Sequence, residues 1–379
     1  MAKTGFTHSP AKIKVIGIGG GGCNAITRMV REDIRGVEFI AMNSDAQALA
    51  ITEAPIRVQL GEKLNRGLGV GGDHNMGAKA AEENRDELTQ LIVGADMVFI
   101  TAGMGGGTGT GAAPVVAEIA KKSGALTIAI VTRPFSFEGN HRSQVAEEGI
   151  KRLLENVDTL IQIPNDRLLK LCDATTNVDN AFRLADDVLR HGVQAISEVI
   201  TVPGLINLDF ADVKAVMKDA GPAWMSIGFG SGKTRATDAA RDALASPLLD
   251  VSIEGSKGVL FNVVGGESLS LMEVNQAAKV IQEAVDPDAN IIFGVAQDTK
   301  MDKDIRITLI ATGFYSAVGG VGVKRDEEFN KFLKGIKSEE GMDMPSFLRR
   351  PMFNQRRQTP PVTTPVRKPA SAPLQRPKL

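Results

Sequence analysis

Hydrophobic positions in the first half of the chain gather in short runs that are separated by stretches with helical spacing. The runs cover residues 37–42, 97–101, 126–131 and 159–163. Continuous apolar strands that alternate with helices are typical of a parallel sheet covered on both faces, because each strand must be buried on both sides. The pattern therefore predicts an N-terminal α/β domain.

A single long helical pattern follows this domain. From residue 178 to residue 200 the apolar positions keep helical spacing, and the pattern ends before Pro203 and Gly204. Beyond it, strands are predicted at residues 259–264, 290–296 and 305–311, and helices at about residues 234–244 and 269–284. The spacing predicts one long helix that joins the α/β domain to a smaller, mixed α+β domain.

The regular pattern stops after Phe314. A glycine-rich and then charged stretch follows, and residues 351–379 contain seven of the seventeen prolines in the chain. Such a composition is typical of disorder, because it offers too little apolar surface to bury. In the region after Phe314, Phe347 and Leu348, with Arg349 beside them, resemble the anchors of a short motif that folds on a partner. An ordinary linker is the alternative.

Length and composition favour a globular protein of two domains, since 379 residues with 43% hydrophobic content can bury substantial cores. The sequence has no run of eighteen apolar residues and no signal-peptide-like stretch near its start, so we expect a cytoplasmic protein. Cys23 and Cys172 are too few for a disulfide framework, and four scattered histidines lack zinc-site spacing. Both thiols are expected to be structural, although a reactive thiol is the alternative for Cys23.

The charge is distributed unevenly along the chain. The net charge is −1, but residues 351–379 hold six Lys and Arg residues and no acid, so residues 1–350 carry −7. A basic tail on an acidic body suggests that the tail contacts acidic lipid or an acidic protein, and that the core binds no specific nucleic acid.

The densest cluster of glycines directly follows one of the apolar runs. Residues 98–111 read VFITAGMGGGTGTG, and a helix is predicted at about residues 110–121. Backbone N–H groups that no side chain shields can bind phosphate, above all where a helix presents its positive end. Thr108 and Thr110 would add hydroxyl groups. The segment predicts an anion cradle for a polyphosphate, and a flexible glycine-rich turn is the alternative.

A second strand, glycine loop and helix occur nearer the N-terminus. Residues 12–18 have the pattern of a buried strand and lead into GGGGCN at residues 19–24. The fingerprint G-x-G-x-x-G of dinucleotide-binding dehydrogenases also fits this region, with Asp45 near the end of the next apolar run. That alternative leaves the second glycine loop unexplained, whereas two loops that face one phosphate chain explain both.

Two further motifs are discounted. GSGKT at residues 230–234 is similar to a P-loop, but Ile227 stands where that motif requires glycine. TKMD at residues 299–302 is similar to the guanine-reading motif of small GTPases, yet without a P-loop it is interpreted as a polar turn between two strands.

Six motifs occur in order along the chain. They are GGGGCN at 19–24, NSDAQAL at 43–49, GGGTGTG at 105–111, TRPFSFEG at 132–139, IPN at 163–165 and NLDFADV at 207–213. Together they closely resemble the FtsZ family of bacterial cell-division GTPases, in the tubulin superfamily. The similarity runs from about Lys12 to Phe314.

The resemblance implies a Rossmann-like parallel-sheet GTPase domain, a long central helix, a smaller α+β C-terminal domain and a disordered tail. The implied segments are a disordered N-terminus (1–11), the GTP-binding domain (12–176), the central helix (177–202), the C-terminal domain (203–314), a linker (315–341), a partner-binding peptide (342–350) and a basic Pro-rich extension (351–379).

The resemblance also implies a set of nucleotide contacts. The phosphates of GTP or GDP would be bound by Gly20, Gly21, Gly22, Gly103, Gly106, Gly107, Thr108 and Gly109, and further contacts would come from Asn24, Asn43 and Thr132. Ribose contacts fall on Glu138 and Arg142, guanine reading on Asn165 and Asp186, and purine stacking on Phe182. From spacing alone, the first two would form a surface ion pair, Phe182 would be a core residue, and Asp186 would lie on a solvated helix face.

Asp209 and Asp212 are the implied catalytic residues. They lie three residues apart in the first turn of a predicted helix, and spacing alone explains them by the preference of acids for helix N-termini. The resemblance instead implies that both carboxylates, helped by Asn207, orient water and a cation at the γ-phosphate bound by the next subunit.

From this division of the site the resemblance implies head-to-tail filaments that hydrolyse GTP with Mg²⁺ and form the cytokinetic ring at mid-cell, beneath the membrane. Membrane-tethering proteins would bind the peptide that contains Phe347, Leu348 and Arg349. A tubulin-like filament for cell shape or DNA partition is the alternative.

Two segments depart from the family's pattern. Asp73 and His74 lie in the region of the loop that senses the γ-phosphate, where a different pair is expected. The partner-binding peptide normally lies close to the end of the chain, but here a basic extension follows it.

Overall fold

The computed structural model of the chain describes residues 11–172, 177–201, 206, 208–246, 248, 253, 255–298, 301 and 303–314. Outside these residues lie most of the N-terminal segment 1–11, the linker, the partner-binding peptide and the basic extension, together with Asn207.

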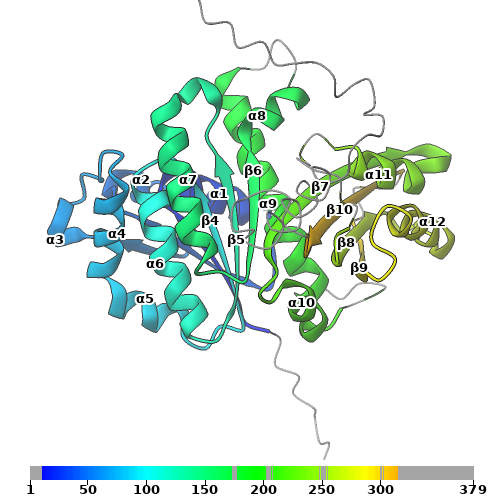
Figure 1. Cartoon of the computed structure of the whole chain (residues 1–379), viewed down its shortest axis with the longest axis horizontal. Helices are drawn as coiled ribbons and strands as arrows, with labels where there is room; N and C mark the ends of the chain where they lie inside the picture. The colour runs from blue at the N-terminus through cyan, green and yellow to red at the C-terminus, as the bar shows by residue number, and fades with distance from the viewer. Residues whose placement is uncertain are drawn as a thin grey trace, which may run out of the picture. The chain divides into compact units, whose positions relative to one another are not determined.

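Six parallel strands form the N-terminal part of one sheet (Figure 1). In spatial order they are β3 (Ile56–Gln59), β2 (Val37–Asn43), β1 (Ile13–Ile18), β4 (Met97–Gly103), β5 (Leu126–Arg133) and β6 (Thr159–Pro164). Successive side chains point to opposite faces, and both faces are buried: Val15 and Ile16 are each fully buried. The four strands predicted from apolar runs are confirmed to within two residues, whereas β3 was not predicted.

Helices cover both faces of this sheet, as the α/β pattern requires (Figure 1). One face is covered by α1 (Gly19–Arg31) and α9 (Val178–Thr201), and the other by α4 (His74–Glu83), α5 (Arg85–Ile92), α6 (Thr108–Lys122) and α7 (Asn140–Leu154). Three short helices lie in the connections: α2 (Ala46–Ala50), α3 (Glu62–Asn65) and α8 (Asn165–Leu168).

The long helix α9 confirms the predicted helix over residues 178–200. Its buried residues, among them Leu189 and Val193, belong to a hydrophobic cluster that also contains Ile128 of β5 and Ile310 near the C-terminal end of the sheet. The helix therefore buries apolar side chains from both halves of the molecule.

The C-terminal strands extend the same sheet. They are β7 (Gly221–Ser231), β10 (Asp304–Thr312), β8 (Gly258–Gly265) and β9 (Asn290–Gln297), in that spatial order, and helices α10 (Phe210–Met217), α11 (Arg235–Leu244) and α12 (Leu271–Gln282) accompany them. β7 pairs in parallel with β6 over three residues and antiparallel with β10 over nine. Over the described residues the result is a ten-stranded mixed sheet, and the predicted fold class is confirmed.

Strand β7 was missed because its glycines disrupt the apolar alternation, and the structure explains why they are there. A β-carbon added to Gly228 would lie 2.1 Å from the carbonyl oxygen of Ala239, and one added to Gly230 would lie 2.0 Å from that of Arg235. Helix α11 therefore packs directly on the backbone of β7, which only glycine permits.

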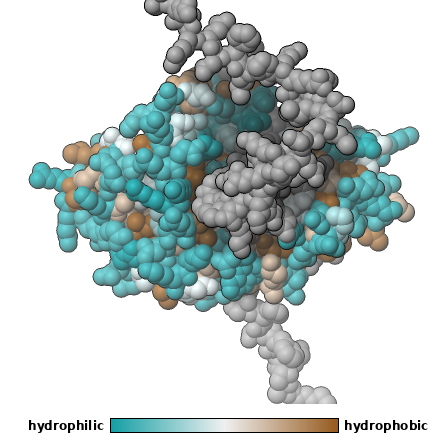
Figure 2. Space-filling view, viewed as in Figure 1, coloured by the Kyte–Doolittle hydropathy of each residue, from teal (hydrophilic) through white to brown (hydrophobic). Residues whose placement is uncertain are grey.

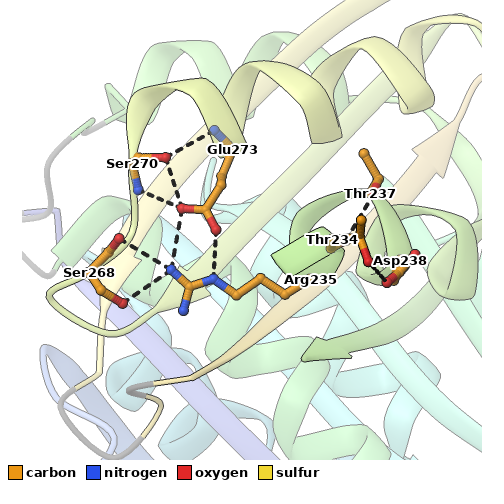
Figure 3. A network of polar contacts seen from close by, with 7 residues as sticks. All are labelled: Thr234, Arg235, Thr237, Asp238, Ser268, Ser270 and Glu273. Atoms are coloured by element: carbon orange, nitrogen blue, oxygen red, sulfur yellow. Dashed lines mark hydrogen bonds and ion pairs between the residues drawn. The ribbon is translucent and has the colours of Figure 1, made fainter. Parts of the chain in front are cut away.

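A buried ion pair joins α11 to α12 (Figure 3). The guanidinium of Arg235 donates to Glu273 at 2.7 Å and to the hydroxyl and carbonyl of Ser268, while Glu273 accepts the N–H of Ser270 at 2.9 Å. The hydrogen bond from Arg235 lowers the pKa of Glu273 to about 2. Thr234, the residue before α11, donates to Asp238 in the first turn of that helix (Figure 3). A carboxylate therefore already lies near the N-terminus of α11, where a P-loop would hold a phosphate, and this agrees with the interpretation that GSGKT is no P-loop.

The surface in view is mainly hydrophilic, with small separate hydrophobic spots (Figure 2). Most of the large exposed apolar side chains come from different elements, for example Ile51, Leu68 and Val93. Among the described residues, no helix is both long enough and apolar enough to cross a membrane.

We expect Gly111→Ala to destabilise the protein. The added methyl would lie 2.0 Å from the carbonyl oxygen of His74 and 2.6 Å from the amide nitrogen of Ala78, so α4 and α6 would have to separate. Overpacking of this kind costs about 1–3 kcal/mol, and for a folded unit of this size we expect a fall in the melting temperature of roughly 2 °C or more.

The matched control is Gly192→Ala in α9. There the methyl would meet the flexible ends of Met225 and Ile130, and alanine raises helix propensity. A melting temperature for Gly111→Ala as high as that of Gly192→Ala would contradict the close packing of α4 on α6.

Candidate functional site

The candidate site lies at the carboxyl edge of the parallel strands. β1 and β4 are neighbours in the sheet, but β1 is followed in sequence by β2 on one side while β4 is followed by β5 on the other. Ligands of open α/β sheets bind in the crevice outside such a switch point. The loops that leave β1 and β4 here are the two glycine-rich segments.

The two glycine loops lie against each other with no side chains between them. A β-carbon added to Gly19 would lie 2.8 Å from the amide nitrogen of Gly109, and one added to Gly21 would lie 3.3 Å from that of Gly103. Around Gly20 there is open space. The predicted juxtaposition of the two loops is therefore observed.

Each loop ends in a helix that has no side-chain cap. α1 begins at Gly19 and α6 at Thr108, two residues before the predicted start, and no side chain caps either N-terminus. Their first backbone N–H groups remain available, and both helix dipoles favour negative charge. Together they can hold the phosphates of one polyphosphate chain.

The two threonines of the second loop have different roles. The Thr108 hydroxyl lies 2.5 Å from that of Ser44, at the end of β2. The Thr110 side chain is buried, and its hydroxyl accepts the N–H of Gly105 at 2.8 Å. The expectation that Thr110 offers its hydroxyl to a ligand is therefore wrong, because the group braces the loop from inside.

Three other predicted nucleotide contacts lie around the same edge. Asn43 and Thr132 are buried at the ends of β2 and β5, and Thr132 is paired in register with Gly103. Asn24 is exposed on α1, beside the loop.

Glu138 and Arg142 form the ion pair that their spacing predicts, with 2.5 Å between carboxylate and guanidinium. The Glu138 side chain is largely buried, and its other oxygen accepts the N–H of Phe135 at 2.9 Å. The carboxylate is thus fixed at the start of α7, with Arg142 more exposed than Glu138.

Phe182 is 40% exposed rather than a core residue, so the prediction from spacing alone is wrong. Its ring packs at nearly a right angle to the ring of buried Phe135, with 5.3 Å between ring centroids. A half-exposed aromatic ring on a fixed support can stack on a planar base.

Asn165 and Asp186 are the two polar residues predicted to read the base that would stack on Phe182. Asn165 is 4% exposed, and its buried Oδ1 atom has no hydrogen-bond partner among the described residues, which is costly unless a ligand supplies a donor. Asp186 lies one turn after Phe182 and is largely buried, not on a solvated face. Burial raises the pKa of Asp186 to about 6, although Arg28 of α1 donates to it at 3.1 Å and opposes the rise.

A cavity of about 590 Å³ opens beside the second glycine loop. It is lined by Gly71, Gly72, Asp73, His74, Gly105, Gly106, His141, Arg142 and Val145. Asp73 caps α4 by accepting the N–H groups of Asn75 and Met76, and His74 lies 3.5 Å from Glu148. Sequence reasoning did not find His141, which no motif distinguishes.

Asp209 and Asp212 lie away from this edge. The end of α9 contacts the segment before β2, where Thr201 donates to the carbonyl of Arg35. The last residue of α10, Met217, lies at the amino end of β6, where its carbonyl accepts the hydroxyl of Thr159. Both carboxylates are exposed, and neither has a hydrogen bond or ion pair among the described residues. The fold therefore does not bring them to the glycine loops of the same chain.

Cys23 is buried below the first loop, and burial raises the pKa of its thiol to about 11. A thiol that stays protonated is a poor nucleophile, so the structural interpretation of Cys23 is supported over the reactive one.

Comparison with known proteins agrees with this arrangement. Residues 12–173 match the GTPase domain of the Tubulin/FtsZ family, and residues 221–315 match the C-terminal domain of the FtsZ family. The chain belongs to the FtsZ family. It is accordingly a GTPase, and this excludes the oxidoreductase alternative.

Solved structures of FtsZ from M. jannaschii are similar over most of the chain. An FtsZ dimer described as empty shares 44% identity, covers 84% of this chain and 96% of its own, and has a TM-score of 0.79. A point mutant of FtsZ from the same organism shares 46% identity with 82% and 94% coverage and a TM-score of 0.80. CetZ1 of Haloferax volcanii, at 21% identity, 86% and 99% coverage and a TM-score of 0.69, shares the fold.

We expect Arg28→Ala to raise the pKa of Asp186 above its value of about 6, because the hydrogen bond and the positive charge of Arg28 both favour the carboxylate. A carboxyl-carbon NMR titration would measure it. The control is Arg31→Ala on the same helix, which removes a surface pair with Glu53. An unchanged or lower pKa in Arg28→Ala would contradict the ion pair.

Proposed function

We propose that this chain is a GTP-dependent, self-assembling GTPase whose subunits join head to tail into the filaments of a cytokinetic ring. Each subunit binds GTP at the glycine loops, and Asp209 and Asp212 of the next subunit, with Asn207, complete the catalytic site.

The nucleotide would lie along the carboxyl edge of the sheet. Its phosphates meet the backbone of Gly20, Gly21, Gly22, Gly103, Gly106, Gly107, Thr108 and Gly109, and Asn24, Asn43 and Thr132 flank them. Glu138 and Arg142 contact the ribose, and Phe182 stacks on the base. The orphan Oδ1 of Asn165 and the buried carboxylate of Asp186 support guanine, which presents N–H donors on its Watson–Crick edge.

The observation that carries the proposal is the separation of the acidic pair from the glycine loops. Helix α9 has 24 residues. At 1.5 Å per residue it spans about 36 Å, and it runs from Phe182 beside the base site toward the segment that carries Asp209 and Asp212. Two exposed carboxylates at the far end cannot serve the pocket of their own chain, but they can serve that of a neighbour.

Such an interface joins different surfaces on the two partners, so it repeats without closing and produces a filament. The relative described as an FtsZ dimer supports self-association.

Hydrolysis would rest on positioning and electrostatics. The backbone amides and both helix N-termini hold the phosphates, and the neighbour's carboxylates orient the attacking water, whose oxygen displaces GDP from the γ-phosphorus. Among the described residues, no three His, Cys, Asp or Glu side chains come together as a metal site. Mg²⁺ would therefore be held mainly by phosphate oxygens and water, as is usual for this ion, and would neutralise charge on the phosphates.

Assembly in the cytoplasm at mid-cell would need a tether to the membrane. We assign this to Phe347, Leu348 and Arg349, which would bind membrane-tethering division proteins, and the basic extension would add contacts to acidic lipid or protein. These segments lie outside the described residues. A filament for cell shape or DNA partition shares the same chemistry, and a fluorescent fusion that never gathers at mid-cell would favour it.

We expect nucleotide affinity to depend on the ionisation of Asp186. The folded-state pKa of about 6 means that the carboxylate gains a proton as the pH falls through 6 and then loses an acceptor for guanine. GDP affinity should therefore fall between pH 7 and pH 5, measured by calorimetry. Asp186→Asn should bind GDP about tenfold or more weakly, lose this pH dependence and gain affinity for xanthosine diphosphate, because its amide donates where the carboxylate accepts. An Asp186→Asn variant that prefers GDP to xanthosine diphosphate as strongly as the wild type does would overturn the assignment of Asp186 to guanine reading.

We expect GTPase activity per subunit to rise from near zero above a threshold concentration, because each pocket needs a neighbour. Asp212→Asn should bind GTP normally and lose at least about 10²-fold in turnover, which is typical when a positioned catalytic group is removed. The control is Asp219→Asn, another exposed acid near the amino ends of the strands, which should retain activity.

Constant specific activity on dilution would exclude a shared site. Loss of GTP binding in Asp212→Asn would show that the acidic loop has been assigned wrongly. Sedimentation with GTP and with GDP provides the parallel measurement of assembly.

A further inference from the structure

The connection between β5 and α7 carries two groups of the base and ribose side of the proposed nucleotide site. Phe135 supports Phe182, and Glu138 ends the short turn that begins at Ser136. Gly139 follows with φ +96°, a conformation that glycine adopts easily. The connection is short, and what fixes it determines where Glu138 and Phe135 lie.

A carboxylate from the neighbouring connection fixes it. Asp166 accepts the N–H of Ser136 through Oδ1 at 2.9 Å and the Ser136 hydroxyl through Oδ2. The two residues are thirty positions apart, so this is a tertiary contact. Charge-assisted hydrogen bonds of this kind are stronger than neutral ones.

The contact between Asp166 and Ser136 lies just beyond the last backbone pairing of β5 with β6. The last paired residues of β5 and β6 are Arg133 and Pro164, and proline has no N–H to continue the ladder. Asp166 lies two residues beyond Pro164 and joins the two connections just outside the sheet.

A local explanation for Asp166 does not fit the geometry. An acid in the first turn of a helix often caps that helix, but α8 has no side-chain cap. Both oxygens of Asp166 are directed to Ser136, on another element.

Asp166 also directly follows Asn165, whose buried Oδ1 has no partner within the part of the chain that the structure describes. One carboxylate therefore joins the turn that presents Asn165 to the turn that presents Glu138 and Phe135. A shift of either turn changes the distance between the base-reading and the ribose-binding groups.

We propose that Asp166 is a positioning residue that makes the site bind guanine and ribose as one unit, through its two hydrogen bonds to Ser136. This inference rests on the proposed function, because it assumes that the nucleotide occupies this edge. Asp166 itself touches neither base nor sugar in this scheme.

The test compares the affinities of GDP, 2′-deoxy-GDP and IDP, by calorimetry on the full chain. Diphosphates separate binding from hydrolysis. IDP lacks the exocyclic amine of guanine, and 2′-deoxy-GDP lacks one ribose hydroxyl. The wild-type protein should prefer GDP to both.

Asp166→Ala should bind GDP about tenfold more weakly. The ratios of its affinity for GDP to its affinities for IDP and for 2′-deoxy-GDP should both fall toward one, because an unanchored turn no longer holds Glu138 at a fixed distance from Asn165. Asp166→Asn should recover most of the affinity, since its amide oxygen can accept the Ser136 N–H while its NH₂ donates to the hydroxyl. Ser136→Ala, which keeps the backbone bond, should give an intermediate loss. Asp286→Ala, which removes a carboxylate bond to the N–H of Asp288 in the C-terminal region, is the matched control and should bind like wild type.

The inference would be overturned if Asp166→Ala weakened the binding of GDP, IDP and 2′-deoxy-GDP equally, or if its two affinity ratios stayed within twofold of the wild-type ratios. If Asp166→Ala does not fold, Ser136→Ala and Asp166→Asn decide it by the same ratios. A wild-type protein that binds GDP with no preference over ADP would overturn the proposed function, and this inference with it.

Discussion

The contact of two bare backbones at the switch point of the sheet is the constraint on which the site depends. Gly19 and Gly21 lie so close to Gly109 and Gly103 that β-carbons on the first pair would press on the second. Only residues without side chains let the N-termini of α1 and α6 converge on one point, and only convergence gives a single ligand two helix dipoles. Most of the other groups of the site lie around this point.

The same geometry explains why the molecule would act as a polymer. Parallel strands direct every loop of the cradle to one edge, while α9 carries the chain to the opposite edge before Asp209 is reached. If Asp209 and Asp212 act as proposed, a fold with these two ends completes its chemistry only by stacking. The asymmetry of the subunit and the proposed filament would then both follow from one topology.

The sequence predicted the strands with continuous apolar runs, the long helix and the two glycine loops, because burial on both faces and exposed backbone both leave clear patterns. It missed β3, which has four residues, and β7, whose glycines serve the packing of α11. The prediction that Thr110 contacts the ligand was wrong, because the sequence does not indicate whether a hydroxyl beside a glycine loop points toward the ligand or into the loop. The positions of Asn165, Phe182 and Asp186 came only from the family resemblance, because their proximity depends on helices and strands far apart in sequence.

The ionisation of Asp186, beside the proposed base position, depends on where α1 holds Arg28. Burial alone would favour protonated Asp186, which could not accept two donors from guanine, and Arg28 opposes that tendency. Arg28 lies in the last turns of the helix whose first residues form the cradle. A displacement of α1 by the phosphates would therefore also move the cation that keeps Asp186 ionised. With the nucleotide bound as proposed, phosphate binding and base reading would be coupled through one helix, so the binding free energies of the two ends of the nucleotide should not be additive.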